Sequence, residues 1–361
     1  NVHVNVVVPP TAFALAEREH ANGRPFLAAL VIGSDLMCRL GASCETLGNE
    51  HKGWFYTSIH GIFAAAATAA KLLGLDVVAT RHAFGLALSQ VSGTQQCMIE
   101  PSLAKRMQSA FAARAGILSA LLAQRGVTAP RQAFEGKFGL YGMYQDGDAE
   151  RLLADLGRRY ENMNLSIKKY PSCGCNHTSI EGALQLVREY KLEPDDVISA
   201  EVEISPFMYR LVGGQYEPGD NPQVAAQFSV RYSVACAILR GGLGLTDIQA
   251  EAALDPAVRS LVSRVSVVED KTNAGKRAPA IVRIKSKRHG LLARRVDHVP
   301  GTPQAPLSDT ELRAKIRDCM ALGVAQRDEA GIDRLVDQMN RIEDCADMSG
   351  FFAAGETRPR T

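Results

Sequence analysis

The sequence predicts a mainly α-helical protein with a second, α+β domain, and two changes of pattern along the chain support this. Residues 10–129 carry long alanine- and leucine-rich runs at helical spacing, separated by single glycines and short polar turns. After Lys168, strand-like runs alternate with helical runs, and helical patterns return near the C-terminus. We therefore expect a discontinuous helical domain of residues 1–166 and 305–361 and an α+β domain of residues 167–304.

The expected helices of the first domain follow from apolar periodicity and from stop signals. In the run after Ser58, apolar residues recur three and four positions apart, and the alanines between them allow close helix packing. Gly126 and Pro130 are typical of a helix end. We expect helices over residues 10–20, 25–42, 58–73, 80–91 and 107–125.

The second domain is expected to hold three strands and two helices. The strand-like runs cover residues 198–204, 263–270 and 279–287, and the helical runs cover 177–190 and 223–240. A turn near His289 predicts a hairpin within the basic run 276–295, which we interpret as a solvated edge and not as a nucleic-acid surface. Ser308 and Glu311 form a capping-box pattern that predicts a helix start.

The composition is that of a globular chain large enough for two cores. The chain has 361 residues, of which 46% are hydrophobic and 22% charged, with a formal net charge of +2. Neither a nucleic acid nor a membrane partner is indicated, since no apolar run was found of the roughly 18 to 20 residues that a span needs. The eight scattered cysteines favour reduced thiols in a cytoplasmic compartment. Because the chain opens at Asn1 within an ordered pattern, we expect an N-terminal piece to be missing.

The most informative motif is KKYPSCGCNHTSIEGA at residues 168–183. Cys173, Cys175 and His177 alternate, so in an extended segment all three side chains would share one face. A structural zinc ion needs four ligands, and no second pair completes the set, so we expect no metal. Two interpretations stay open from the residues alone, a packed turn with a partly buried histidine and a catalytic or substrate-binding His177.

Two further segments, GWFYTSIHGIFAAAATAAKLLGLD at 53–76 and QFSVRYSVACAILRGG at 227–242, add to this motif. Together the three resemble the MmgE/PrpD family, which includes 2-methylcitrate dehydratases, cis-aconitate decarboxylases and an iminodisuccinate epimerase. The resemblance implies an all-helical domain, a smaller α+β lid domain, a homodimer formed through the helical domain, and chemistry without a cofactor. In the family, a K-x-[YF]-P-x-C-x-x-x-H segment lines the active-site cleft. Lys168 and His177 match its ends, which implies substrate binding by the lysine and catalysis by the histidine.

The resemblance also implies roles near the N-terminus and in the run that follows Ser102. The opening NVHVNVVVPP resembles H-P-[ST]-x-x-V-x-P, so His3 matches a catalytic histidine, although the proline after it is Val4 here. Lys105 matches the active-site lysine of K-R-L-H-x-G-x-A-A, and Gln108 replaces the histidine that follows it. Lys105 and Arg106 at a helix start are misplaced cations unless an anion shares the site, which favours a carboxylate clamp over two solvated charges.

The segment 53–76 departs most from the family, because the family's histidine falls on Phe55. A phenyl ring can neither accept a proton nor hydrogen-bond a carboxylate, so that role would pass to Tyr56 or His60, or be absent. We expect both to bind substrate, while a buried, satisfied His60 stays open. Tyr232 matches the tyrosine of F-S-[LV]-x-Y-x-[VA]-A and is expected to be catalytic. On periodicity alone, it belongs to an ordinary core stripe.

These residues predict a cofactor-independent lyase that removes a proton beside a carboxylate of a small di- or tricarboxylate. Such a step needs a base, cations for the carboxylates, and a donor for the leaving group. Dehydration of 2-methylcitrate is the leading expectation. The alternatives are an epimerase or decarboxylase of a related acid, and a catalytically silent paralogue, which Phe55 and Gln108 would explain.

Overall fold

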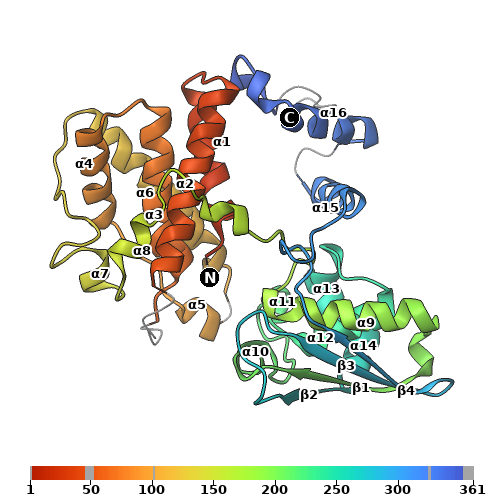
Figure 1. Ribbon diagram of the computed structural model, residues 1–361. Coiled ribbons are helices and arrows are strands. Elements are labelled where there is room, and N and C mark those ends of the chain that lie inside the picture. The colour runs from red at the N-terminus through yellow and green to blue at the C-terminus, as the bar shows by residue number, and fades with distance from the viewer. Residues whose placement is uncertain (1, 45–52, 101, 324–326, 353–361) are drawn as a thin grey trace. The chain divides into compact units, whose positions relative to one another are not determined.

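The computed structural model describes residues 2–44, 53–100, 102–323 and 327–352 and divides the chain into two compact units (Figure 1). Unit 1 contains residues 1–163 and 327–361, and unit 2 contains residues 164–326. A helical unit formed by both chain ends and a unit with a four-stranded sheet match the expected fold class. Helix α15 (Asp309–Ala321) falls in unit 2, whereas the sequence analysis placed it with the helical domain.

Unit 1 is built around helix α3 (Tyr56–Leu72), which is buried on all sides. Residues 57–70 are all buried and most of them are apolar, as expected for a helix enclosed by others. The helices packed against α3 are α1 (Val8–Arg18), α2 (Gly23–Ser43), α4 (Val77–Leu88) and α6 (Ala104–Gln124). Three shorter helices complete this region, α5 (Gln96–Ile99), α7 (Leu140–Met143) and α8 (Ala149–Leu153).

Small side chains allow the neighbours of α3 to approach its backbone closely. A Cβ atom added at Gly116 of α6 would lie 2.5 Å from Ala65 Cβ and 2.6 Å from the Ile62 carbonyl oxygen. A Cβ added at Gly33 of α2 would lie 1.9 Å from Thr68 Oγ1. Both distances are far below van der Waals contact. The alanine- and glycine-rich pattern of the sequence therefore sets the helix spacing.

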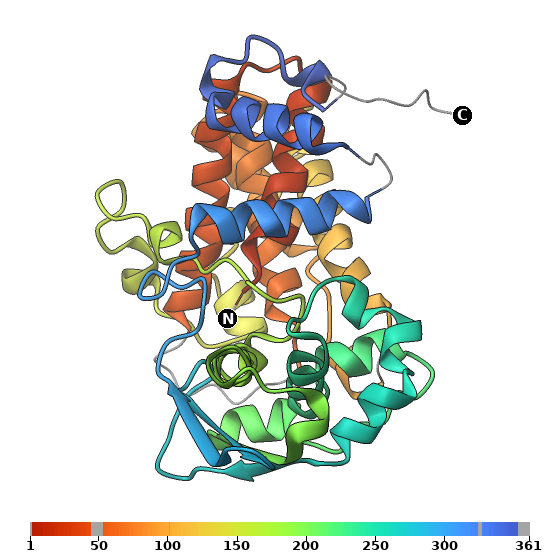
Figure 2. The ribbon, with the colours of Figure 1, turned by 90° about the vertical axis from the view of Figure 1, so that its right-hand side faces the viewer.

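Both chain ends contribute to unit 1, and Figure 2 shows the C-terminal segment beside the N-terminal helices. Helix α16 (Glu329–Asn340) is followed by two short 3-10 turns. The Gly23 amide donates to the Cys345 carbonyl at 2.8 Å, and the Met348 amide donates to the Ala21 carbonyl at 2.9 Å. The Phe13 ring lies 4.7 Å from that of Phe352 between centroids. These contacts join the C-terminal segment to α1, to the start of α2 and to the loop between them.

One helix among the described residues, α2, is long and apolar enough to cross a membrane by length and composition. The sequence analysis expected no such run, and α2 passes the test because few of its residues are charged. Half of its apolar window is buried inside the structure, and the helix packs against α3. Since a core helix also passes this test, the finding is weak evidence for a span.

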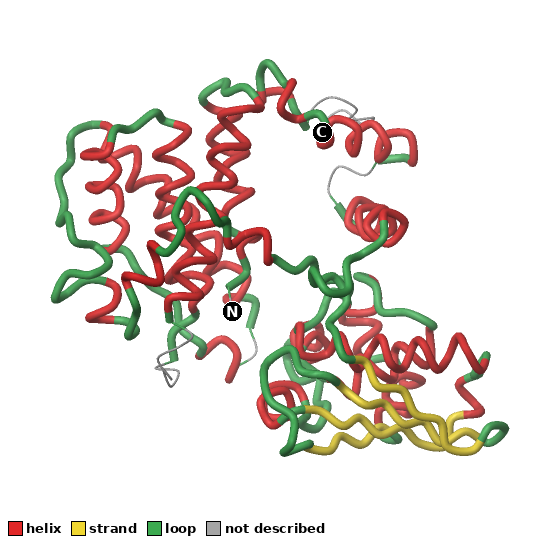
Figure 3. Tube along the Cα trace, viewed as in Figure 1, coloured by secondary structure: helices red, strands yellow, loops and turns green. Residues whose placement is uncertain are grey.

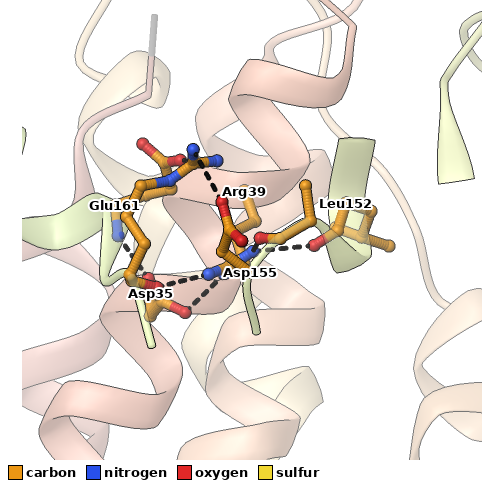
Figure 4. Close-up of polar contacts among 7 residues, drawn as sticks. Asp35, Arg39, Leu152, Asp155 and Glu161 are labelled. Atoms are coloured by element: carbon orange, nitrogen blue, oxygen red, sulfur yellow. Dashed lines mark hydrogen bonds and ion pairs between the residues drawn. The ribbon is translucent and has the colours of Figure 1, made fainter. Parts of the chain in front are cut away.

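A buried ion pair fastens the loop after α8 to α2 (Figure 4). Asp35 and Arg39 are 6% and 2% exposed, and Arg39 Nε donates to Asp35 Oδ2 at 2.6 Å. The guanidinium also donates to the carbonyls of Leu152 at 3.1 Å and of Ala154 and Arg159. The second carboxylate oxygen of Asp35 accepts the amide of Glu161. The carboxylate of Asp35 and the guanidinium of Arg39 are thus both held by hydrogen bonds, as buried charges require.

Unit 2 contains a mixed sheet with strand order β2-β1-β3-β4 (Figure 3). Its strands are β1 (Val197–Ile204), β2 (Val265–Glu269), β3 (Ala280–Ser286) and β4 (Gly290–Val296). Strand β1 pairs with β2 in parallel and with β3 antiparallel, and β3 and β4 form the expected hairpin. Alternate residues of β1 are buried, whereas Glu201 and Glu203 of the same strand pair with Arg283 on the opposite face.

The buried face of the sheet packs against α9 (His177–Tyr190), which contacts β3 and β4, and against α12 (Val230–Arg240), which contacts β2. The single helix expected over 223–240 was wrong. It is divided into α11 (Pro222–Gln227) and α12, because Ser229 is extended and its hydroxyl accepts the Tyr232 amide at 3.2 Å. The capping box before α15 is confirmed, since Ser308 Oγ accepts the Glu311 amide at 3.3 Å. Helices α10 (Pro206–Val212), α13 (Ala250–Ala253) and α14 (Pro256–Val262) complete the unit.

The buried pair gives a stability prediction. Arg39→Met should lower the free energy of unfolding by about 3 to 5 kcal/mol, because Asp35 and three carbonyls would stay buried without their donor. Arg159→Ala is the matched control, since its half-exposed side chain forms ion pairs at the edge of the same network and should cost about 1 kcal/mol or less. Chemical denaturation measures both, and equal losses would show that the buried pair contributes no more than a surface one.

Candidate functional site

Unit 1 gathers several of the expected site residues at one end of two parallel helices. Ser58 Oγ in the first turn of α3 donates to the Gln108 carbonyl in the first turns of α6 at 3.2 Å, so the N-termini of both helices lie together. His3 Nδ1 and the His3 amide lie 3.1 and 3.2 Å from Thr57 Oγ1. Lys105 Nζ lies 5.5 Å from the centroid of the Phe55 ring. The structure therefore brings His3 and Lys105 to the start of α3.

This end of unit 1 is electrostatically suited to an anion. Neither Phe55 before α3 nor Leu103 before α6 supplies a side-chain hydrogen bond to its helix. The first amides of a helix carry a partial positive charge and attract anions. The ammonium of Lys105 in the first turn of α6 adds a full charge of the same sign. Two helix starts and a lysine together favour a carboxylate ligand over solvated charges.

Tyr56 and His60 lie one helical turn apart at the start of α3. Their rings stack with centroids 5.5 Å apart at an interplanar angle of 22°. His60 is only 2% exposed, and its Nε2 lies 2.8 Å from Gln145 Nε2, whose amide also donates to Cys44 Sγ. Burial lowers the pKa of His60 to about 4 against the opposing hydrogen bond from Gln145, so the imidazole is neutral. His60 Nδ1 has no hydrogen-bond partner among the described residues, so the histidine is buried but only partly satisfied, and substrate binding by His60 stays a prediction.

The two departures from the family pattern have structural partners here. Gln108, in place of a histidine, donates to the Thr94 carbonyl at 3.0 Å and to Cys97 Sγ at 2.9 Å. Its side-chain amide therefore binds the segment before α5. Phe55, in place of the other histidine, is 9% exposed and lies under the ammonium of Lys105. Arg106, the neighbour of that lysine, is exposed.

Unit 2 places His177 at the first residue of α9, almost fully buried. Within the described part of the chain, neither ring nitrogen has a hydrogen-bond partner of normal geometry. Burial and then the charge of Lys168 lower the pKa of His177 to about 3, against the opposing carbonyls of Ser172 and Tyr170. Lys168 Nζ donates to the Ser172 carbonyl at 2.9 Å. The structure thus brings Lys168 and His177 together, as the motif implied.

Further unsatisfied polar atoms surround the start of α9. Asn176 Nδ2 donates to the Gln227 carbonyl and to Ser233 Oγ, but Asn176 Oδ1 has no partner among the described residues. The same holds for Ser179 Oγ. Buried polar groups without partners are costly, and a cluster of them marks a place that a polar ligand would satisfy. The sequence analysis missed Asn176 and Ser179, although both flank His177 in the motif.

Tyr232 is fully buried on α12, and its geometry is that of a core residue. Its hydroxyl donates to the Asp247 carbonyl, and its ring lies 5.0 Å from that of Tyr216. Burial, followed by the contact with Cys236, raises the pKa of the phenol. A polar hydroxyl that already has a backbone partner does not need a substrate to satisfy it. The catalytic role of Tyr232 stays a prediction. The hydrogen bond to the Asp247 carbonyl supports the alternative, in which Tyr232 is an ordinary core residue.

Metal-ligating side chains do not cluster in the described part of the chain, where no group of three or more His, Cys, Asp or Glu residues could hold an ion. All eight cysteines lie in that part, and no disulfide joins any two of them. Cys173, Cys175 and His177 lie around a 3-10 turn (Gly174–Asn176) and not on an extended strand. The extended segment in which all three side chains would share one face is therefore not formed, because the backbone at Gly174 is helical.

Comparison with known proteins identifies the class to which the two units belong. The model of the MmgE/PrpD N-terminal domain matches residues 1–152, and that of the MmgE/PrpD C-terminal domain matches residues 170–341. The chain therefore belongs to the MmgE/PrpD family. The N-terminal match lies within unit 1, and the C-terminal match covers most of unit 2 and also α16, which belongs to unit 1.

Three named proteins are similar to this chain along much of its length. The cis-aconitate decarboxylase-like protein oryM of Aspergillus oryzae is 28% identical, over 98% of this chain and 77% of that protein. The cis-aconitate decarboxylase of Aspergillus terreus is 27% identical, over 65% of this chain and 51% of its own length. The mouse cis-aconitate decarboxylase is 22% identical, over 95% of this chain and 72% of its own length.

His177 gives a prediction of pH dependence. An unfolded histidine has a pKa near 6.5, whereas that of folded His177 is about 3, so below pH 6.5 the unfolded state binds a proton that the folded state does not. Stability should therefore fall as the pH falls, by about 2 kcal/mol at pH 5 from this residue. In chemical denaturation, His177→Gln should reduce the difference in free energy of unfolding between pH 7 and pH 5 by this amount. The control is His298→Gln at an exposed position, which should leave that difference unchanged. An unchanged difference in His177→Gln would contradict the lowered pKa of His177.

Tyr232→Phe separates the two interpretations of Tyr232. The loss of the hydrogen bond to Asp247 should cost about 1 kcal/mol of folding stability and leave turnover nearly intact. Melting temperature and turnover are measured on the same variant. A stable but inactive protein would instead make the hydroxyl catalytic, since removing a donor in a water-shielded site costs roughly a hundred- to a thousandfold in turnover.

Proposed function

We propose that this protein is a cofactor-independent lyase that acts on a small tricarboxylate. The observation that carries the proposal is the position of Lys105 at the shared N-terminal end of α3 and α6, where neither helix has a side-chain cap. A carboxylate at this position would be attracted both by the partial positive charges of the two helix starts and by the ammonium. His3 lies at the same end through its contact with Thr57 and could move a proton there.

Decarboxylation of cis-aconitate is the reaction that the relatives favour, since two of them are named cis-aconitate decarboxylase and a third is named cis-aconitate decarboxylase-like. Loss of carbon dioxide from such an acid leaves an electron pair on carbon beside a remaining carboxylate. A cation fixed at that carboxylate lowers the energy of this charge, and a general acid then supplies a proton. Lys105 has the first role in this proposal and His3 the second. In unit 2, burial lowers the pKa of His177 to about 3, so this imidazole is neutral and is suited to accept a proton and not to supply one.

Dehydration of 2-methylcitrate is the second candidate, and it rests on the three sequence segments that resemble the family. It begins with the removal of a proton next to a carboxylate, and an epimerase would begin in the same way. The chemistry therefore needs the same cation and a base instead of an acid. Phe55 and Gln108 occupy positions at which the family pattern has histidines. If no acid reacts, the protein would instead be a catalytically silent member of the family.

The experiment supplies each acid in turn and follows product by NMR in deuterated water. The acids are cis-aconitate, 2-methylcitrate and aspartate-derived acids. We expect deuterium-labelled product and loss of carbon dioxide from cis-aconitate. Loss of water from 2-methylcitrate would select dehydration, and exchange without net loss would select epimerisation. The absence of exchange with every acid would contradict the lyase proposal.

Lys105→Ala should lower kcat and raise KM together, because the lysine holds a carboxylate in the ground state and holds it more strongly in the transition state, where negative charge develops beside it. The loss of a charge-assisted hydrogen bond is about 2 kcal/mol, which is roughly thirtyfold in kcat/KM. Steady-state kinetics on the preferred acid measures it. Lys71→Ala is the matched control, since Lys71 is exposed in the last turn of α3 and should leave both constants unchanged. Equal constants for Lys105→Ala and the parent would remove Lys105 from the site.

A further inference from the structure

Two cysteines flank Gly174 directly before α9, and they differ in exposure. Cys175 is 5% exposed, whereas Cys173 is partly exposed. Cys173 is in an extended conformation, with φ −60° and ψ 137°, and Gly174 begins the 3-10 turn that leads to the helix. A Cβ atom added at Gly174 would meet no atom within 4 Å, so the outer side of this turn is open.

The backbone at this turn already has the spacing of a disulfide. Helical geometry at Gly174 sets the Cα atoms of its two neighbours roughly 5 to 5.5 Å apart. Disulfides join Cα atoms about 4.4 to 6.8 Å apart. The two side chains also meet, since a hydrogen bond with Cys173 is the leading cause that raises the pKa of the Cys175 thiol. The two thiols are therefore in contact, and a bond between them needs little backbone movement.

The surroundings give the two thiols different chemistry. Cys175 Sγ donates to the Lys276 carbonyl at 3.2 Å, and burial adds to the contact with Cys173 in keeping Cys175 protonated. Cys173 is the sulfur that a solute can reach. The cations Lys168 and Arg277 oppose this rise in the pKa of Cys175 but do not reverse it. Cys173 is thus suited to attack and Cys175 to resolve.

We propose that Cys173 and Cys175 are a redox-active dithiol that a low-molecular-weight disulfide oxidises. The Cys173 thiolate attacks one sulfur of the disulfide, whose S–S bond breaks and releases one thiolate. Cys175 then gives its proton to the released thiolate and attacks the Cys173 sulfur, which expels the second thiolate. Two electrons and two protons pass from the cysteines to the reagent, which becomes two thiols.

Oxidation at this position would act on the groups of unit 2 that face His177. Ser172, whose carbonyl accepts Lys168, precedes Cys173 directly, and His177 follows Cys175 by two residues. A disulfide that closes so short a loop restrains the turn that orients them. We therefore expect oxidation to lower turnover, and this second step rests on the proposed function. Turnover of the reduced protein is measured first, so an inactive reduced protein counts against the lyase and not against the dithiol.

The experiment treats the full chain, first reduced, with oxidised glutathione and then blocks the remaining thiols with iodoacetamide. Trypsin releases residues 170–188, a peptide with two cysteines, Cys173 and Cys175. We expect this peptide to be unalkylated and lighter by two hydrogen atoms, and to be fully alkylated after dithiothreitol. Turnover should fall on oxidation and recover on reduction. A disulfide without a change in turnover would support the dithiol and overturn its coupling to the reaction.

Single variants test the two roles. Cys175→Ser should stop at a mixed disulfide between Cys173 and glutathione, whereas Cys173→Ser should leave buried Cys175 alkylated only after unfolding. Cys319→Ser is the matched control and should still form the disulfide, because Cys319 is an exposed cysteine of α15. In the parent protein, glutathione on Cys319 shows that the oxidant was active. Glutathione on Cys319 with both thiols of the turn still reduced would overturn the proposal, and a melting curve of each variant confirms that it is folded.

Discussion

The burial of α3 on all sides is the constraint on which unit 1 depends. Its neighbours can enclose it because alanines and glycines at the contacts keep the helix axes close, as at Gly116 against Ala65. The same packing fixes α6 parallel to α3, so both helix starts lie at one end. The amides at those starts and Lys105 then form a positive region without any dedicated loop. Helix packing and anion attraction therefore come from one arrangement.

Some buried polar groups in this protein have hydrogen-bond partners, and others do not. The pair of Asp35 and Arg39 is fully matched by side-chain and backbone partners, so it joins two segments of unit 1 without leaving an orphan charge. At the start of α9, by contrast, His177, Asn176 and Ser179 leave buried atoms without partners among the described residues. Buried polar atoms without partners are costly, and a polar ligand would satisfy those at the start of α9. Unsatisfied buried atoms also occur in unit 1, at His60 Nδ1 and Gln145 Oε1.

The fold class could be predicted because its signals are local. Apolar spacing gave the long helices, alternation gave β1, β2 and β3, and the turn near His289 gave the hairpin with β4. One expectation failed where a single side chain decided, since Ser229 caps a new helix inside an apolar run. The helical backbone at Gly174 likewise decided that Cys173, Cys175 and His177 lie around a 3-10 turn and not in an extended segment. Periodicity averages over many residues and does not register such single positions.

Sequence by itself determined which residue types were present for carboxylate chemistry and the order of the motifs that identify the family. Tertiary structure decided their surroundings, and those surroundings set their chemistry. Tyr232 matched a family motif, yet its hydroxyl has a backbone partner that lies fifteen residues further along the chain. His60 and His177 carry the same imidazole as His3, but burial lowers their pKa values while His3 is exposed. Desolvation and hydrogen bonding depend on atoms brought together from distant positions, and no window of sequence contains them.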